Sequence, residues 1–197
     1  QHHRHLLALL ARCGYETVKT FLQTAAGRIN AVPGAIVCVQ TFGSLLDFHP
    51  HLHILVTWGV FEPGGAFVPV DDVPEEEGVQ KLFRHKVLRM LLDHGVIDDE
   101  LVRSLLAWHH TGFGTHVGEI VFPHTQETDQ PKGVKGLLEY LVRAPVALTR
   151  MRLAEGDHVV STADRVHPRH EANFRLFTPL DFIAAVVAHI PDPHKKS

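Results

Sequence analysis

Cysteine, long apolar runs and a basic excess are scarce or missing in this sequence of 197 residues. The two cysteines, Cys13 and Cys38, have no CxxC spacing and lie in apolar patterns, so we expect buried thiols instead of metal ligands or a disulfide. No apolar run approaches the roughly 18 residues that cross a bilayer, and the first residues lack the hydrophobic core of a signal peptide. We therefore expect a soluble, cytoplasmic protein with no membrane partner.

The charge balance excludes a protein that coats duplex DNA by charge alone. The net charge is -3, with 19 Lys and Arg against 22 Asp and Glu, whereas such a protein needs a clearly basic face. Residues 71–100 are acidic, but residues 143–175 contain six arginines and only four acids. The arginines of the second segment are suited to binding the phosphate backbone of DNA. The equal alternative is that they form an ordinary solvent-exposed surface with no such role.

Length and composition favour one domain with a hydrophobic core. Apolar residues make up 45% of the chain and charged residues 21%, as in ordinary globular proteins. We expect a single domain over residues 1–197. Because the first residue is not Met and a helical pattern is already running by Leu6, we also expect a domain truncated at both ends.

Apolar periodicity predicts both helices and strands. Helices are expected at 5–27, 74–94, 98–108, 130–144 and 178–189. Strands are expected at 35–41 and 49–57, on both sides of the turn at 61–67, and at 146–153 and 158–162. Residues 35–41 are apolar on both faces, which is typical of a central, buried strand. A short loop joins this strand to the next, so the two should form an antiparallel hairpin.

The strand expected at 49–57 carries three histidines within five residues. Because strand side chains alternate between faces, His51 and His53 share one face and Leu52 lies on the other. Neutral imidazoles two residues apart can bind one cation, so the pair is a candidate metal site. His49 has the same parity but precedes Pro50, which makes it a weaker candidate. The alternative is a histidine-rich strand without metal.

Gln40 lies near the end of the preceding strand, where the hairpin brings it toward these histidines. A second group of histidines lies in the segment 109–116, which is rich in glycine and has no helical period. This loop is either close to the chemistry or simply a loop.

Tyr140 lies on the helix expected at 130–144. Val134, Leu137, Leu138 and Leu141 form one apolar stripe, and Tyr140 lies off it, on the side of Gly133 and Gly136. Glycine within a helix costs up to about 1 kcal/mol relative to alanine, so two on one side indicate close approach by another molecule. The alternative is a partly buried surface tyrosine.

Taken together, these segments resemble the HUH endonucleases, and more specifically the two-tyrosine transposases of the insertion sequence 91 type. The resemblance extends over most of the chain in the family's order. It is carried by the segments 40–43, 48–57 with 59–61, 109–116, 136–145, and 177–182 with 189–191, of which the histidine motif is the most specific.

The resemblance implies an α+β fold with a central antiparallel sheet, the histidine strand in its middle and helices packed on it. It implies a DNA transposase that cuts and rejoins single-stranded DNA at mobile-element ends. Mg or Mn would be bound by His51, His53 and Gln40, with His49 and the loop 109–116 as reserves for the third ligand. Tyr140 would attack the phosphate and form a 5′-phosphotyrosine.

The sequence departs from the family pattern in two places. Many relatives have a second tyrosine four residues before the first, where this chain has Gly136, and its other tyrosine is Tyr15. The expected cysteine-rich N-terminal segment is also missing, so we expect a fragment or decayed copy. Two alternatives stay open: a catalytically inactive DNA-binding remnant, and a cupin-like metalloenzyme suggested by Gly43 and His49-Pro-His51, although the glutamate expected at 55 or 56 is absent.

Overall fold

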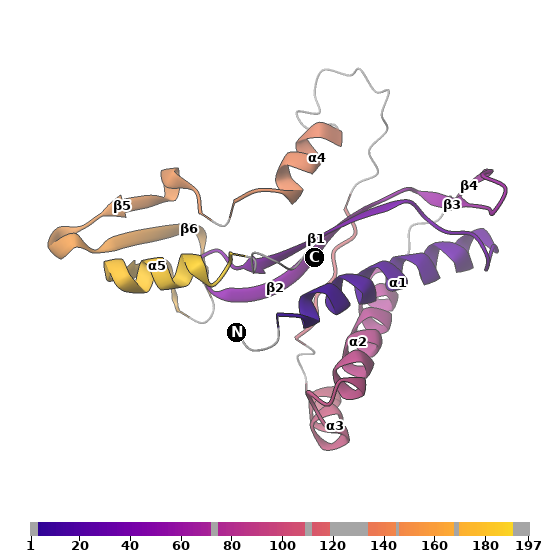
Figure 1. Ribbon diagram of the computed structural model, residues 1–197, viewed down its shortest axis with the longest axis horizontal. Helices are drawn as coiled ribbons and strands as arrows, with labels where there is room; N and C mark the ends of the chain where they lie inside the picture. Colours follow the sequence, from indigo (N-terminus) through magenta and orange to yellow (C-terminus); the bar gives the residue numbers. More distant parts are fainter. Residues whose placement is uncertain are drawn as a thin grey trace. The chain divides into compact units, whose positions relative to one another are not determined.

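The computed structural model describes residues 4–71, 75–108, 112–118, 134–144, 146–167 and 170–190, with only the backbone for 134 and 135. The chain divides into two compact units. The histidine unit contains Val39–His53 and the chain from Lys135 onward, and the helical unit contains Arg4–Cys38 and Ile54–Val134. Strands β1 (Ala35–Phe42) and β2 (Phe48–Val56) contribute residues to both units (Figure 1).

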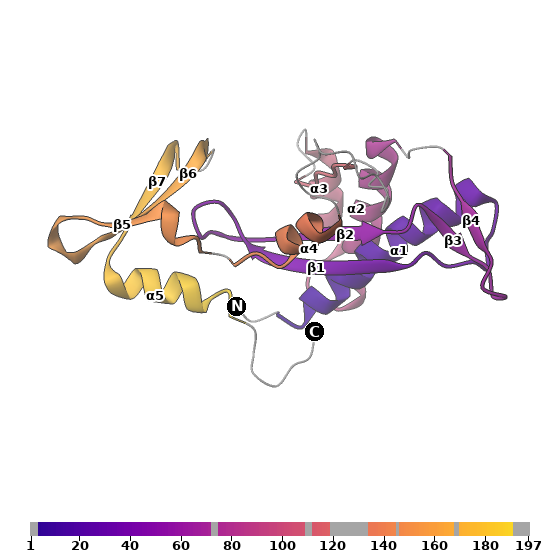
Figure 2. The same cartoon turned by 90° about the horizontal axis from the view of Figure 1, so that it is seen from above.

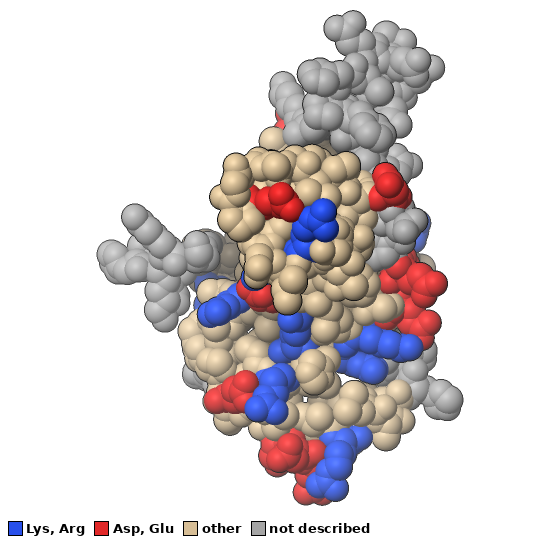
Figure 3. Space-filling view, turned by 90° about the vertical axis from the view of Figure 1, so that its right-hand side faces the viewer, with Lys and Arg blue, Asp and Glu red and all other residues tan. Residues whose placement is uncertain are grey.

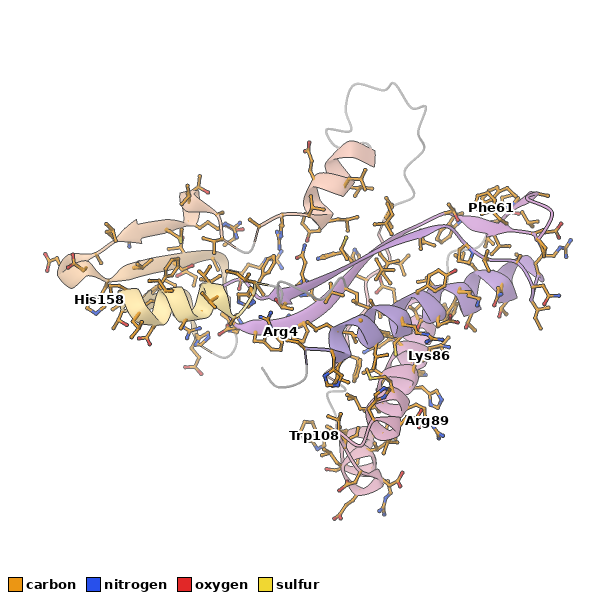
Figure 4. All side chains as sticks on the ribbon, viewed as in Figure 1. Arg4, Phe61, Lys86, Arg89, Trp108 and His158 are labelled. Carbon is orange, nitrogen blue, oxygen red and sulfur yellow. The ribbon has the colours of Figure 1, made fainter. Side chains whose placement is uncertain are left out.

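The helical unit is built on α1 (Leu6–Ala26), α2 (Glu76–Asp93) and α3 (Asp99–Ala107). Helix α1 ends at Gly27, whose φ of 62° is left-handed and therefore suits glycine. The Asp98 side chain caps α3 by accepting the Leu101 N–H at 2.8 Å. Helix α3 is followed by Trp108, which is 60% exposed (Figure 4). The three helices expected in this part of the sequence are therefore confirmed.

A short hairpin completes the helical unit beside α1 (Figure 2). Its strands β3 (Gly59–Phe61) and β4 (Phe67–Pro69) pair antiparallel, with Phe61 opposite Phe67. Its side chains join α1 in a buried cluster of Leu22, Ala31, Val60 and Val70. This cluster is a hydrophobic core of the unit, in which Cys13, Val87 and Leu88 are also buried.

Replacing Leu22 with alanine should destabilise this core strongly. Leu22 is only 3% exposed, and emptying such a site typically costs about 2–5 kcal/mol of unfolding free energy. Urea unfolding followed by circular dichroism measures the loss. Ile29→Ala is the matched control, because Ile29 is 81% exposed and surface changes stay within about 0.5 kcal/mol. Equal losses for the two variants would contradict this placement of the core.

The histidine unit contains α4 (Val134–Leu141), a three-stranded antiparallel sheet and α5 (Pro179–Val187). The sheet has the order β5 (Met151–Leu153), β6 (Val159–His167), β7 (Ala172–Phe177). The turn from β5 to β6 carries His158 (Figure 4). The Thr178 side chain caps α5 by accepting the Asp181 N–H, and the Phe177 and Phe182 rings lie 5.8 Å apart.

The fold confirms an α+β protein with antiparallel sheets but corrects the expected central sheet. The described strands form three separate small sheets, and β2 pairs only with β1. The expectation that 35–41 is a strand buried on both faces is also wrong, since Ile36 is 49% exposed. A two-stranded ribbon leaves much of its surface uncovered. The single-domain expectation stays a prediction.

Several element boundaries differ from the sequence expectations. Helix α4 ends at Leu141, and the expected residues 130–133 lie outside the described part. A 3-10 turn at Leu148–Arg150 replaces the start of the strand expected at 146–153. Strand β7 (Ala172–Phe177) was not expected, although its sequence alternates apolar Ala172, Phe174 and Leu176 with polar Asn173 and Arg175.

The described helices include none that is long and apolar enough to cross a membrane. On the face drawn in Figure 3, acidic and basic side chains are interspersed and neither sign covers the surface. This mixture agrees with the small net charge of -3.

Candidate active site

Strand β2 brings the histidines of the sequence motif close together within the histidine unit. The ring centroids of His51 and His53 lie 5.0 Å apart, as expected for residues on one face of a strand. The His49 ring lies 5.5 Å from that of His51, but His49 is exposed, whereas the other two are partly buried. The structure thus brings together the two histidines that the sequence singles out.

Each imidazole of this pair has a nitrogen suited to binding a cation. His51 Nδ1 lies 2.8 Å from the carbonyl oxygen of His49 and must donate to it, which leaves Nε2 with a lone pair. His53 Nε2 is buried and has no hydrogen-bond partner among the described residues. Burial, with smaller contributions from His51 and Arg143, lowers the pKa of His53 and favours the neutral ring.

Gln40 presents an unpaired oxygen in the same unit. Its side chain is buried on β1, at 4% exposure, and its Nε2 donates to the Leu141 carbonyl at 3.1 Å. Its Oε1 is buried without a partner among the described residues. Leaving such an atom unpaired costs about 1–3 kcal/mol. Gln40 Oε1 and the neutral His53 ring both offer atoms of the kind that bind divalent metals, and both atoms are buried without a partner among the described residues, so the chemistry of the residues present fits a divalent metal.

Tyr140 lies against the histidine pair. Helix α4 sets its ring edge-on to the His53 ring at a centroid distance of 5.0 Å, and the side chain stays 44% exposed. The Arg143 guanidinium lies 4.8 Å from the centre of the tyrosine ring, in cation–π contact. Leu141 is buried as its stripe predicts, although Leu138 is 37% exposed. Tyrosine, arginine and histidines therefore form one cluster with an accessible phenol ring.

The second reserve candidate, the loop 109–116, is described only in part. In the segment 109–116, residues 109–111 lie outside the described part, and the described remainder belongs to the helical unit. There, His116 Nδ1 lies 3.0 Å from Glu76, which also accepts the Val117 N–H. These contacts, the Val117 N–H first, lower the pKa of Glu76. Gly133 also lies outside the described residues, so the open space expected on that side of Tyr140 has no structural description.

Sequence reasoning missed a second polar cluster in the histidine unit. Asp47 lies within bonding distance of His167, His170 and Arg175. His167, His170 and Arg175 lie in the arginine-bearing segment 143–175, and Asp47 lies in the loop between the strands expected at 35–41 and 49–57. The spacing of His167 and His170 around a turn was the available signal, but nothing in the sequence linked them to residue 47.

Comparison with known families identifies a family to which the chain is similar. The family model described as "Putative transposase" matches residues 34–197, which is more than half of the chain. Searches among curated proteins and among solved structures give no significant match. The family match disfavours the cupin-like alternative. The matched range contains the histidine strand, Gln40, Tyr140 and the Asp47 cluster, and the chain belongs to this transposase family.

Proposed function

We propose that the protein cuts and rejoins single-stranded DNA at the ends of a mobile element, as an HUH-type transposase. Its nucleophile is Tyr140, and its Mg or Mn ligands are His51, His53 and Gln40. The observation that carries this proposal is the contact of the Tyr140 ring with His53, a residue whose buried Nε2 has no partner among the residues that the structure describes. The transposase family supplies DNA as the partner.

The ligand residues would hold the cation through Gln40 Oε1 and the Nε2 atoms of His51 and His53. Two of these atoms, Gln40 Oε1 and His53 Nε2, are buried without a hydrogen-bond partner among the described residues. Gln40 contributes Oε1, and its Nε2 bond to Leu141 fixes the amide so that the oxygen cannot exchange places with the nitrogen. His51 and His53 contribute Nε2, and the His49 carbonyl fixes the tautomer of His51. A bound divalent cation would polarise the scissile phosphate and offset charge that develops on its oxygens.

Tyr140 performs the covalent step. Its phenol oxygen attacks phosphorus and loses its proton to water, while the bond from phosphorus to the 3′ oxygen breaks. The 3′ oxygen takes up a proton and leaves as a hydroxyl, and the 5′ phosphate stays esterified to Tyr140. Because one phosphodiester replaces another, rejoining by the 3′ hydroxyl needs no nucleotide cofactor.

Arg143 is suited to binding the DNA phosphate beside the nucleophile. Its guanidinium contacts the Tyr140 ring at 4.8 Å and lies 6.0 Å from the Phe42 ring. Arginine binds phosphate oxygens with two parallel hydrogen bonds, which would orient the scissile group.

Single strands are the proposed substrate for two reasons. The net charge of -3 means that the chain has no excess of positive charge for coating a duplex. In-line attack also needs a phosphodiester that is free to adapt its position to one tyrosine and one cation. Gly136 stands where many relatives have a second tyrosine, so one chain forms one covalent link at a time. Strand transfer with two simultaneous links would then need a second chain.

The proposal is tested by incubating the protein with Mn and labelled random-sequence single-stranded DNA. We expect a covalent protein–DNA adduct that survives denaturation, forms only with the metal, and is weaker with a duplex of the same pool. Peptide mapping of the adduct should find the modification on Tyr140. DNA binding without any adduct would instead favour the inactive DNA-binding remnant, and an adduct equally abundant on duplex DNA would contradict single-strand preference.

A further inference from the structure

A second histidine cluster in the histidine unit is built around Asp47, whose side chain is only 12% exposed. The carboxylate lies 3.0 and 3.1 Å from His170 Nε2 and 3.2 Å from His167 Nε2. It also accepts a hydrogen bond of 3.0 Å from Arg175 Nη1. The cluster shares no residue with the site at Tyr140.

Local structure places all of these groups. Leu46, which precedes Asp47, is buried and has a left-handed φ of 62°, a conformation that costs leucine about 1–2 kcal/mol. On the other side, His167 ends β6, and its carbonyl accepts the N–H groups of His170 and Glu171 in the following turn. The two imidazole rings lie 4.9 Å apart. A bent loop and a tight turn therefore present three ligand atoms to one another.

We propose that Asp47, His167 and His170 form a second metal site, which binds Zn²⁺. One ligand atom from each residue lies within 4.8 Å of the other two. A tetrahedral zinc ion with bonds of about 2.0–2.2 Å separates neighbouring ligand atoms by about 3.3 Å, close to the spacings between Asp47 and the histidines. Two imidazole nitrogens and one carboxylate oxygen suit Zn²⁺ better than the harder Mg²⁺.

Arg175 takes the position of a residue that orients a ligand. It holds Asp47 Oδ1, and its guanidinium lies 4.4 Å from the Phe177 ring, which restricts its movement. Oδ2 then remains for the cation. The positive charge of Arg175 also repels the cation. The binding free energy from the three direct ligands must therefore exceed this repulsion.

The role of this site is to brace the strand that carries the catalytic histidines. Asp47 immediately precedes β2, whereas His167 ends β6 and His170 lies in the turn that follows it, more than a hundred residues later. Zinc would fix these two segments to each other within one unit. Such a cross-link stabilises the folded state because the unfolded chain does not hold the ligands together.

Cobalt titration tests the site, because four-coordinate Co²⁺ reports zinc sites by its visible absorption. The reference protein is the full chain with His51→Ala and His53→Ala, which removes the other metal site. We expect it to bind Co²⁺ with bands of a four-coordinate ion that Zn²⁺ displaces, and Zn²⁺ to raise its Tm. Adding His167→Gln and His170→Gln should lower the affinity by more than about 100-fold.

Two further variants keep the test decisive. Asp47→Asn preserves the shape of the side chain and removes its charge, so it should weaken Co²⁺ binding even if the double glutamine variant fails to fold. His158→Gln in the β5–β6 turn is the matched control and should leave binding unchanged. If the reference protein binds no Co²⁺, or if its affinity is the same after the changes at 47, 167 and 170, the cluster is a metal-free ion-pair network and the proposal is overturned.

Discussion

Replacing Tyr140 with phenylalanine is expected to abolish covalent protein–DNA adducts. The change removes one oxygen, the proposed nucleophile, and removal of a nucleophile typically lowers a rate by several orders of magnitude. The ring remains, so its contacts with His53 and Arg143 are kept. Affinities for single-stranded DNA and for Mn should therefore stay within about twofold. Denaturing gels of the labelled adduct and equilibrium binding measure the two effects separately.

Tyr15→Phe is the matched control for this experiment, because Tyr15 is the other tyrosine of the chain and belongs to the helical unit. It should form adducts at the wild-type rate. Adducts that persist in Tyr140→Phe and disappear in Tyr15→Phe would transfer the nucleophile to Tyr15. Adducts that persist when Tyr15→Phe and Tyr140→Phe are combined in one chain would exclude a tyrosine mechanism altogether.

Replacing His51 and His53 together with alanine is expected to remove metal-dependent cleavage. Changing only a residue that supports a ligand costs about 10–100-fold in metal affinity or activity, and losing two direct ligands should cost more. Adduct formation across a series of Mn concentrations measures the loss. The single variants should each approach the effect of the double variant, because neither imidazole alone holds the cation in place.

His94→Gln is the control for the histidine variants. His94 caps α2 in the helical unit, where its Nδ1 contacts the Met90 carbonyl on an exposed surface. The control should cleave like the wild type. Wild-type cleavage by the double alanine variant would contradict the metal assignment. If the variant instead cleaves slowly, and its remaining activity depends on Mn concentration as the wild type does, these histidines only support the fold.

Local features of this molecule were predictable from the sequence because they depend on neighbouring residues. The parity of His51 and His53 follows from strand geometry, and their rings do lie on one side at 5.0 Å. The start of α5 follows from the sequence Thr178-Pro-Leu-Asp181, which is typical of a capped helix N-terminus, and the Asp181 N–H does donate to the Thr178 side chain. Helices with a strong apolar period, such as α1, were placed to within a residue or two.

Long-range features were not predictable, because periodicity says nothing about which distant segments meet. Gln40 bonds to the backbone of α4, one hundred residues away, and only the resemblance to a family had linked these segments. No pattern linked Asp47 to His170. The expected burial of 35–41 was wrong for a related reason. The apolar composition of a strand indicates that its faces are suited to burial, but it does not show that another helix or strand packs on them.

The division of the chain has a practical consequence for shortened forms of the protein. The histidine unit consists of Val39–His53 and of the chain from Lys135 onward. Most of the helical unit, residues 54–134, is inserted between these two parts. A product ending anywhere in that insertion would keep His51 and His53 and lose Tyr140. It would retain the two histidine ligands without the proposed nucleophile, so metal binding in a truncated product would be no evidence that the product can cut DNA.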